Sequence, residues 1–75
     1  MRLLLADDDV NLRGVLERGL KEEGYVVDAV ANGAEALAHL RTYEYAICIL
    51  DWRMPGSSGL EVISWARGAG SQTPF

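Results

Sequence analysis

The chain has 75 residues, of which 49% are hydrophobic and 24% charged, and its formal net charge is −4. A chain of this length forms at most one domain, and its ordinary composition excludes a disordered polypeptide. The acidic balance argues against a nucleic-acid-binding surface, no apolar stretch is long enough to span a membrane, and the single cysteine excludes an intrachain disulfide.

The first strand is predicted at residues 3–6, where Leu-Leu-Leu-Ala forms a short apolar run typical of a strand covered on both faces. A helix is predicted next, because apolar residues recur there at helical spacing. These residues are Leu12, Val15, Leu16 and Leu20. Gly24 predicts the end of that helix, and the β-branched stretch 25–30 predicts a second strand.

A second helix is predicted from Asn32, whose side chain can cap it and which is followed three residues later by Glu35. This helix is expected to run to about Arg41. Residues 46–50 form the most apolar run of the chain and predict a central strand that ends at Asp51.

Turn-forming residues at 54–59 predict a loop before the third helix. That helix is expected to begin near Leu60 and to stop at the glycine-containing stretch 68–71. Its apolar positions are Val62, Ile63 and Ala66. Strands that alternate with helices are typical of a parallel sheet with right-handed crossovers, so the sequence predicts an α/β fold.

Three aspartates are expected to converge at one edge of this sheet. Asp7 and Asp8 follow the first strand, and Asp51 follows the third. In a doubly wound sheet of order 2-1-3 these strands are neighbours, and ligands bind at the carboxyl ends of such neighbours. Crowded carboxylates repel one another, and a divalent cation relieves the repulsion. Because oxygen-only ligands favour Mg²⁺ over zinc, the three aspartates predict a magnesium site.

Structural roles are the alternative for these and several other polar residues. Asp9 is expected to cap the first helix, and Asp7 and Asp8 could be solvated loop residues if Asp51 did not join them. Cys48 lies in an apolar run and is expected to be a buried thiol. His39 is expected at the surface. The remaining basic residues of the first half are expected to form a solvated face: Arg2, Arg13, Arg18 and Lys21.

Several segments of the chain resemble the receiver domains of bacterial two-component response regulators. These segments are residues 4–9, 24–27, 32–37, 49–56 and 59–61. The resemblance covers all 75 residues and implies a flavodoxin-like receiver fold, truncated to βαβαβα with parallel strand order 2-1-3. Residues 1–75 would then be one partial receiver domain, and the turn at 54–56 most resembles receivers joined to winged-helix DNA-binding domains.

The resemblance also implies a function. Asp51 would be the phosphoacceptor, Asp8 and Asp51 would hold Mg²⁺ directly, Asp7 would hold it through water, and the main-chain carbonyl of Arg53 would supply another oxygen. Trp52 follows Asp51 and is expected at the mouth of the site, with a packing role favoured over a functional one. A sensor histidine kinase in the cytoplasm would donate the phosphoryl group, and the chain would not itself be an enzyme.

The chain departs from the family pattern at its end. Family receivers continue through a fourth strand ending in Ser or Thr and a fifth ending in Lys, whereas this sequence stops at Phe75 and its only lysine lies in the first helix. The resemblance therefore implies a receiver that is switch-deficient as it stands. With its third strand at an edge, and with Val62, Ile63 and Trp65 incompletely covered, we expect a homodimer or swapped assembly through strand three or helix three.

Two other functions remain open at this stage. One is a non-signalling interaction or dimerisation module derived from a receiver. The other is a phosphatase with an aspartyl nucleophile, which is disfavoured because haloacid-dehalogenase-type enzymes need a second aspartate two positions after the nucleophile, where this chain has Arg53.

Overall fold

The computed structural model describes residues 1–51, 53–54 and 57–75. Its elements follow one another as alternating strands and helices, with a small hairpin before the last helix. They are β1 (Arg2–Ala6), α1 (Val10–Glu22), β2 (Val26–Val30), α2 (Gly33–Thr42), β3 (Ile47–Leu50), β4 (Arg53–Met54), β5 (Ser57–Ser58) and α3 (Gly59–Gly68). In the part of the chain that is described, no helix has the length and apolar character needed to cross a membrane.

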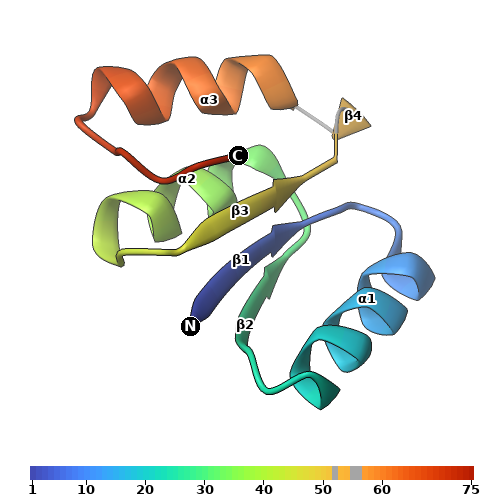
Figure 1. Ribbon diagram of the computed structural model, residues 1–75. Coiled ribbons are helices and arrows are strands. Elements are labelled where there is room, and N and C mark those ends of the chain that lie inside the picture. The colour runs from blue at the N-terminus through green and yellow to red at the C-terminus, as the bar shows by residue number, and fades with distance from the viewer. Residues whose placement is uncertain (52, 55–56) are drawn as a thin grey trace.

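The main sheet has three parallel strands in the order β2-β1-β3, as the sequence predicts. In the register of the sheet, Leu4 of β1 lies between Asp28 of β2 and Cys48 of β3. Helix α1 covers one face of the sheet, and α2 and α3 lie together on the other face (Figure 1). The α/β prediction and the βαβαβα order are therefore confirmed.

The main core lies between the sheet and the pair α2 and α3. Its buried members are Leu4, Ala6, Val30, Ala36, Leu40, Tyr45, Cys48, Met54, Val62 and Ala66. Val62 has no exposed surface, so the expectation that this residue is incompletely covered is wrong. The reason is that α3 packs on α2 and β5, and Val62 belongs to the buried core cluster that also contains Leu4 and Cys48.

Strand β3 is less buried than its apolar sequence suggests. It flanks β1 in the described sheet, and β1 is the central strand. Ile47 and Ile49 point to the α1 side and are each 37% exposed, because α1 lies mainly over β1 and β2. On the free side of β3, the Cys48 N–H donates to the Pro74 carbonyl at 2.8 Å. The last residues of the chain thus already lie along β3.

Helix ends follow the local chemistry of the sequence closely. The Asn32 side chain accepts from the Glu35 N–H at 2.9 Å, and the Glu35 carboxylate accepts from the Ala31 N–H at 3.0 Å. This reciprocal pair resembles a capping box, except that the Glu35 carboxylate accepts from the N–H of the residue before the N-cap and not from that of the N-cap itself. After α1, Gly24 has φ of +93°, which an L side chain rarely adopts, so the glycine allows the turn into β2.

The segment predicted as a loop contains two short strands. β4 and β5 pair antiparallel, with Arg53 opposite Ser58 and Met54 opposite Ser57. The prediction of a loop over 54–59 is therefore wrong at its ends, because a two-residue connection with turn-forming residues also suits a hairpin. Residues 55 and 56 lie outside the described part of the chain. Ser58 then caps α3 by accepting from the Glu61 N–H at 3.2 Å.

A charged network ties β1, β2 and the start of β3 together. The Asp28 carboxylate accepts from Arg2 Nε at 2.9 Å and from the Tyr45 hydroxyl at 2.6 Å. The guanidinium of Arg2 also stacks over the Tyr43 ring, 4.4 Å from its centroid. Burial opposes ionisation of Asp28, but the hydrogen bonds from Tyr45 and Arg2 outweigh it, and the pKa of Asp28 is lowered. Arg2 therefore has a structural role, although its side chain is 41% exposed, as expected for a solvated face.

Asp28→Asn is expected to lower the free energy of unfolding at pH 7 by about 1 kcal/mol, because the substitution replaces charge-assisted hydrogen bonds with neutral ones. The carboxylate is favoured in the folded state, so its contribution is present above the unfolded pKa near 3.8 and is lost as the pH falls below that value. Urea unfolding at pH 7 and pH 3 should show the difference between wild type and variant shrinking at pH 3. Glu17→Gln, which breaks only the exposed pair with Lys21, serves as control. A difference that is the same at both pH values would contradict the role of Asp28.

Candidate metal centre

Three aspartates from two loops meet at the carboxyl edge of the sheet. Asp7 and Asp8 follow β1, and Asp51 follows β3 directly. One carboxylate oxygen from each lies within 4.8 Å of the others. Asp7 is buried, Asp51 is half-buried and Asp8 is exposed, so the cluster opens to solvent on one side. The convergence predicted for these three residues is confirmed.

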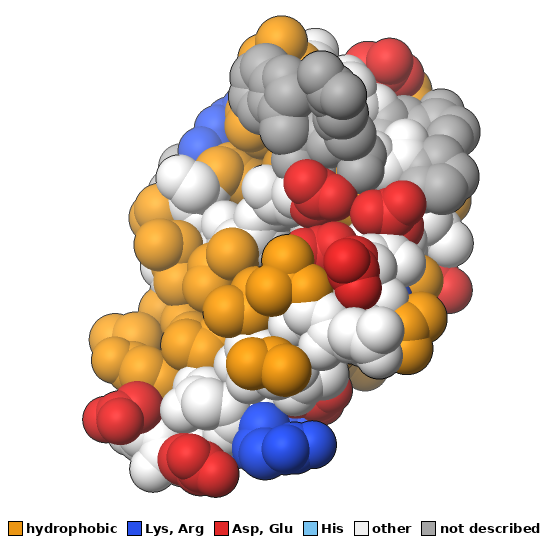
Figure 2. Space-filling model, turned by 90° about the vertical axis from the view of Figure 1, so that its right-hand side faces the viewer, with side chains coloured by type: hydrophobic (Ala, Val, Ile, Leu, Met, Phe, Trp, Pro, Cys, Tyr) orange, Lys and Arg blue, Asp and Glu red, His pale blue; other side chains and the backbone are white. Residues whose placement is uncertain are grey.

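The backbone places this cluster through the parallel pairing of the strands. The Asp7 N–H donates to the Val30 carbonyl of β2 at 3.1 Å, and the Asp51 N–H donates to the Ala6 carbonyl of β1 at 2.8 Å. Both aspartates are thus held one residue beyond neighbouring strands, at the point where chain connections leave in opposite directions from the central strand. Acidic side chains gather on this part of the surface, next to a larger group of apolar ones (Figure 2).

The residue after the pair has the structural role predicted for it. Asp9 is the N-cap of α1, and its side chain accepts from the N–H groups of Asn11 at 3.0 Å and Leu12 at 3.1 Å. The Asp9 N–H in turn donates to Asp7 Oδ1 at 2.9 Å. This bond orients the buried carboxylate.

The donor set suits a hard divalent cation. All three groups offer carboxylate oxygens, and no histidine or cysteine belongs to the described cluster. Two oxygens on the same Mg²⁺ lie at most about 4.2 Å apart, because each bond is about 2.1 Å long. A spread of up to 4.8 Å therefore fits two direct ligands and a third that binds through water or after a small rotation. The residues present fit Mg²⁺.

Arg13 contacts the loop that carries this cluster. Its Nη1 donates to the main-chain carbonyl of Asp7 at 2.8 Å, so its assignment to a solvated face is wrong. The sequence contained one signal for a special role, because a cation near the start of a helix opposes the helix dipole. The first turn of α1 has no acidic residue, and the N-cap Asp9 is the described carboxylate at that end of the helix.

Other residues singled out from the sequence lie away from the cluster or beyond the description. Arg53 begins β4, two positions after Asp51, and the role of its carbonyl as a metal ligand stays a prediction. Trp52 lies outside the described residues.

His39 is half-buried on α2, with Nδ1 at 2.9 Å from the Glu35 carbonyl. Burial raises the pKa of the Cys48 thiol to about 12, so this cysteine is an inert core residue, as predicted.

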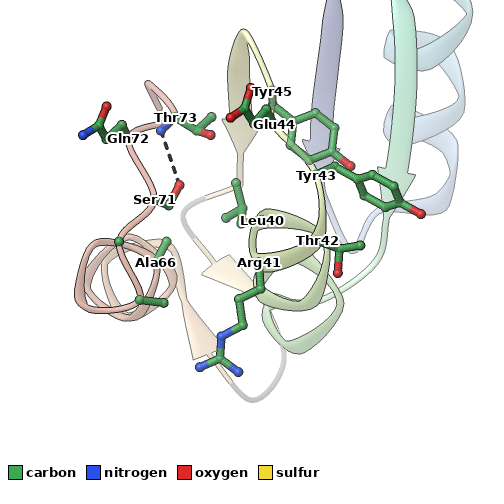
Figure 3. A pocket seen from close by; sticks show the side chains of 12 residues that line it. Leu40, Arg41, Thr42, Tyr43, Glu44, Tyr45, Ala66, Ser71, Gln72 and Thr73 are labelled. Atoms are coloured by element: carbon green, nitrogen blue, oxygen red, sulfur yellow. Dashed lines mark hydrogen bonds between the residues drawn. The ribbon is translucent and has the colours of Figure 1, made fainter.

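A separate groove of about 650 Å³ lies at the opposite edge of the sheet. Its walls are residues 40–45, at the end of α2, and residues 66 and 69–73, at the end of α3 (Figure 3). Within it the Thr73 N–H donates to the Ser71 hydroxyl at 3.3 Å. None of the three clustered aspartates lines this groove, so the metal centre and the groove are different places.

Known proteins with similar sequences or structures cover nearly the whole chain. A family model described as the response regulator receiver domain matches residues 3–75. The transcriptional regulatory protein TctD of Salmonella typhimurium is 43% identical over 74 residues, which make up 99% of this chain and 33% of TctD. The chain therefore spans about a third of the length of this curated relative.

Two solved structures of one protein show the same fold. The response regulator TrrA of Thermotoga maritima, in complex with Mg²⁺–BeF, is 45% identical with a TM-score of 0.85, over 92% of this chain and 60% of that one. TrrA in complex with the histidine kinase ThkA is 43% identical with a TM-score of 0.86, over 96% of this chain and 62% of that one.

Proposed function

Because the chain belongs to the response-regulator receiver domain family of two-component signalling, we propose that it is a phosphoacceptor whose Asp51 takes a phosphoryl group in the presence of Mg²⁺. The observation that carries the proposal is the approach of Asp7, Asp8 and Asp51 to within 4.8 Å at the carboxyl edge of the sheet. The structure of TrrA with Mg²⁺–BeF supports the choice of cation.

Asp51 is the nucleophile in this proposal. It is half-buried at the end of β3, where its main chain is fixed by the bond to Ala6 and a donor can still approach from solvent. A carboxylate oxygen forms a bond to the donor phosphorus, the bond from phosphorus to the donor breaks, and its electron pair leaves with the donor. Bound Mg²⁺ supplies positive charge that offsets the charge of the carboxylates and of the phosphoryl oxygens. Asp8 and Asp51 would hold the cation directly, Asp7 would hold it through water, and the Arg53 carbonyl would supply another oxygen.

The proposed donor is a phosphohistidine on a sensor histidine kinase, and the proposed place of the reaction is the cytoplasm. Support comes from TrrA, which was crystallised with the histidine kinase ThkA. The chain acts as acceptor and not as an enzyme, so it should not turn over p-nitrophenyl phosphate. The prediction that these 75 residues are switch-deficient stays a prediction.

Metal-dependent phosphorylation is the test of this function. Incubation with acetyl phosphate and Mg²⁺ is expected to add one phosphoryl group per chain, seen by intact-mass spectrometry and lost on treatment with hydroxylamine. Excess EDTA is expected to prevent the addition, because the carboxylates then repel the anionic donor. A sample that circular dichroism shows to be folded and that gains no mass with Mg²⁺ would contradict the proposal.

A non-signalling interaction module is the second candidate. It is favoured by the exposed apolar side chains on the α1 side, which include Val10, Val15, Ile47 and Ile49 (Figure 2). In this form we propose a homodimer through β3 or α3. Pro74 already bonds to one position of β3, and Val62 is buried. The remaining candidate contacts are Ile47, Ile49, Ile63 and Trp65. Sedimentation as a compact monomer at micromolar concentration would rule this dimer out.

A further inference from the structure

The side chain of Arg13 makes a contact that the proposed acceptor chemistry does not use directly. Arg13 is the fourth residue of α1, which begins at Val10. Its Nη1 donates to the Asp7 carbonyl at 2.8 Å. Its own N–H donates to the Asp9 carbonyl at 2.8 Å within the helix. One residue of α1 therefore holds the main chain on both sides of Asp8.

The partner chosen by this guanidinium is unexpected on electrostatic grounds. Three carboxylates cluster at the loop that Arg13 touches, and carboxylates are the strongest partners of arginine. The described partner of the Arg13 side chain is, however, the neutral main-chain carbonyl of Asp7. Because Arg13 donates to this carbonyl, it does not occupy the carboxylates of Asp7 and Asp8, of which Asp7 Oδ1 accepts from the Asp9 N–H.

The carbonyl of Asp7 belongs to the peptide that joins Asp7 to Asp8. Since that peptide is planar, holding its oxygen fixes the direction in which the chain enters Asp8. Asp7 has two further constraints, from the Val30 carbonyl and from the Asp9 N–H. For exposed Asp8, the bond from Arg13 is the described side-chain contact that sets the orientation of the preceding peptide.

We propose that Arg13 is a positioning residue, which holds the Asp7–Asp8 peptide so that both carboxylates face the cation. The inference rests on the proposed function, because it assumes that the cluster binds Mg²⁺. The positioning role and the charge of Arg13 predict opposite changes in Mg²⁺ affinity when Arg13 is replaced. By charge alone, removing a cation beside an acidic cluster strengthens Mg²⁺ binding, whereas losing a positioning contact weakens it.

Mg²⁺ titration calorimetry on wild type, Arg13→Gln, Arg13→Lys and Arg18→Gln tests the inference. Arg18 lies on the same helix, is exposed, and provides the matched loss of charge. We expect Arg13→Gln to weaken Mg²⁺ binding about tenfold, which is the usual effect of losing a residue that orients a metal ligand. The affinity of Arg13→Lys should lie between those of Arg13→Gln and wild type. Arg18→Gln should bind Mg²⁺ as wild type does or slightly more tightly. Arg13→Lys also provides the comparison if Arg13→Gln does not fold.

A second measurement separates positioning from general stability. In the metal-free protein, the ¹⁵N–¹H signal of Asp8 should shift or broaden in Arg13→Gln but not in Arg18→Gln, since the Asp8 nitrogen belongs to the peptide that Arg13 holds. Mg²⁺ binding in Arg13→Gln equal to or tighter than in Arg18→Gln would overturn the role of Arg13 and leave the proposed function standing. A folded wild type that binds no Mg²⁺ would overturn both.

Discussion

Asp51→Asn is expected to abolish phosphoryl transfer to the chain while leaving the fold intact. The amide of asparagine has nearly the shape of the carboxylate but is not a nucleophile for phosphorus, so the covalent step is lost completely. The bond from the Asp51 N–H to the Ala6 carbonyl uses only the main chain and is retained. Mg²⁺ binding should weaken at least about tenfold, because one of three ligand charges is removed. Intact mass after incubation with acetyl phosphate, with calorimetry of Mg²⁺, gives both results.

Asp9→Asn is the matched control for that substitution. It removes one negative charge from the same acidic segment, and asparagine caps a helix as well as aspartate does. We expect it to accept a phosphoryl group as wild type does and to change Mg²⁺ affinity by no more than a few-fold, since Asp9 faces the N–H groups of α1. Phosphorylation that persists in Asp51→Asn would place the acceptor elsewhere, and equal losses in both variants would mean that net charge alone governs the reaction.

The parts of the molecule that sequence reasoning predicted correctly are set by local chemistry or by topology. The capping roles of Asp9 and Asn32 depend on side chains that bond to N–H groups two or three residues away. The meeting of Asp7, Asp8 and Asp51 depends on distant residues, but the order 2-1-3 brings the ends of β1 and β3 together whatever their side chains are. The capping residues and the succession of apolar runs and turns can both be read directly from the sequence.

The parts that were missed depend on contacts that no pattern encodes. Arg13 bonds to a main-chain carbonyl, and every residue has one, so the sequence does not show which carbonyl is chosen. Arg2 and Asp28 are 26 residues apart and meet because β1 and β2 are in register. The exposure of Ile47 and Ile49 also depends on where α1 lies over the sheet. A cation near the N-terminus of a helix is unfavourable, which marks Arg13 as unusual but does not indicate its partner.

Leu4→Ala is expected to remove a large part of the stability of the fold. Leu4 is 0% exposed in the central strand, between β2 and β3 and beneath α2. Truncation of such a buried leucine lowers the free energy of unfolding by about 3–5 kcal/mol, because the burial of the removed methyl groups is lost and a cavity is left behind. The total stability of a 75-residue domain is of the order of 4–11 kcal/mol. The variant should therefore populate unfolded molecules easily, and urea unfolding should show a much lower midpoint.

Cys48 provides an independent readout of the same loss. Its thiol is 1% exposed, next to Leu4 in the register, and burial raises its pKa to about 12, so it reacts with a thiol reagent only when the sheet opens. A loss of 3–5 kcal/mol corresponds to labelling roughly 100-fold to 1,000-fold faster or more, since about 1.4 kcal/mol is a factor of ten. Leu60→Ala, at a position 59% exposed on α3, should change the rate by no more than a few-fold. Equal labelling in both variants would mean that Cys48 is reached by local opening at β3, which lies at the side of the described sheet, and that Leu4 does not control access to the core.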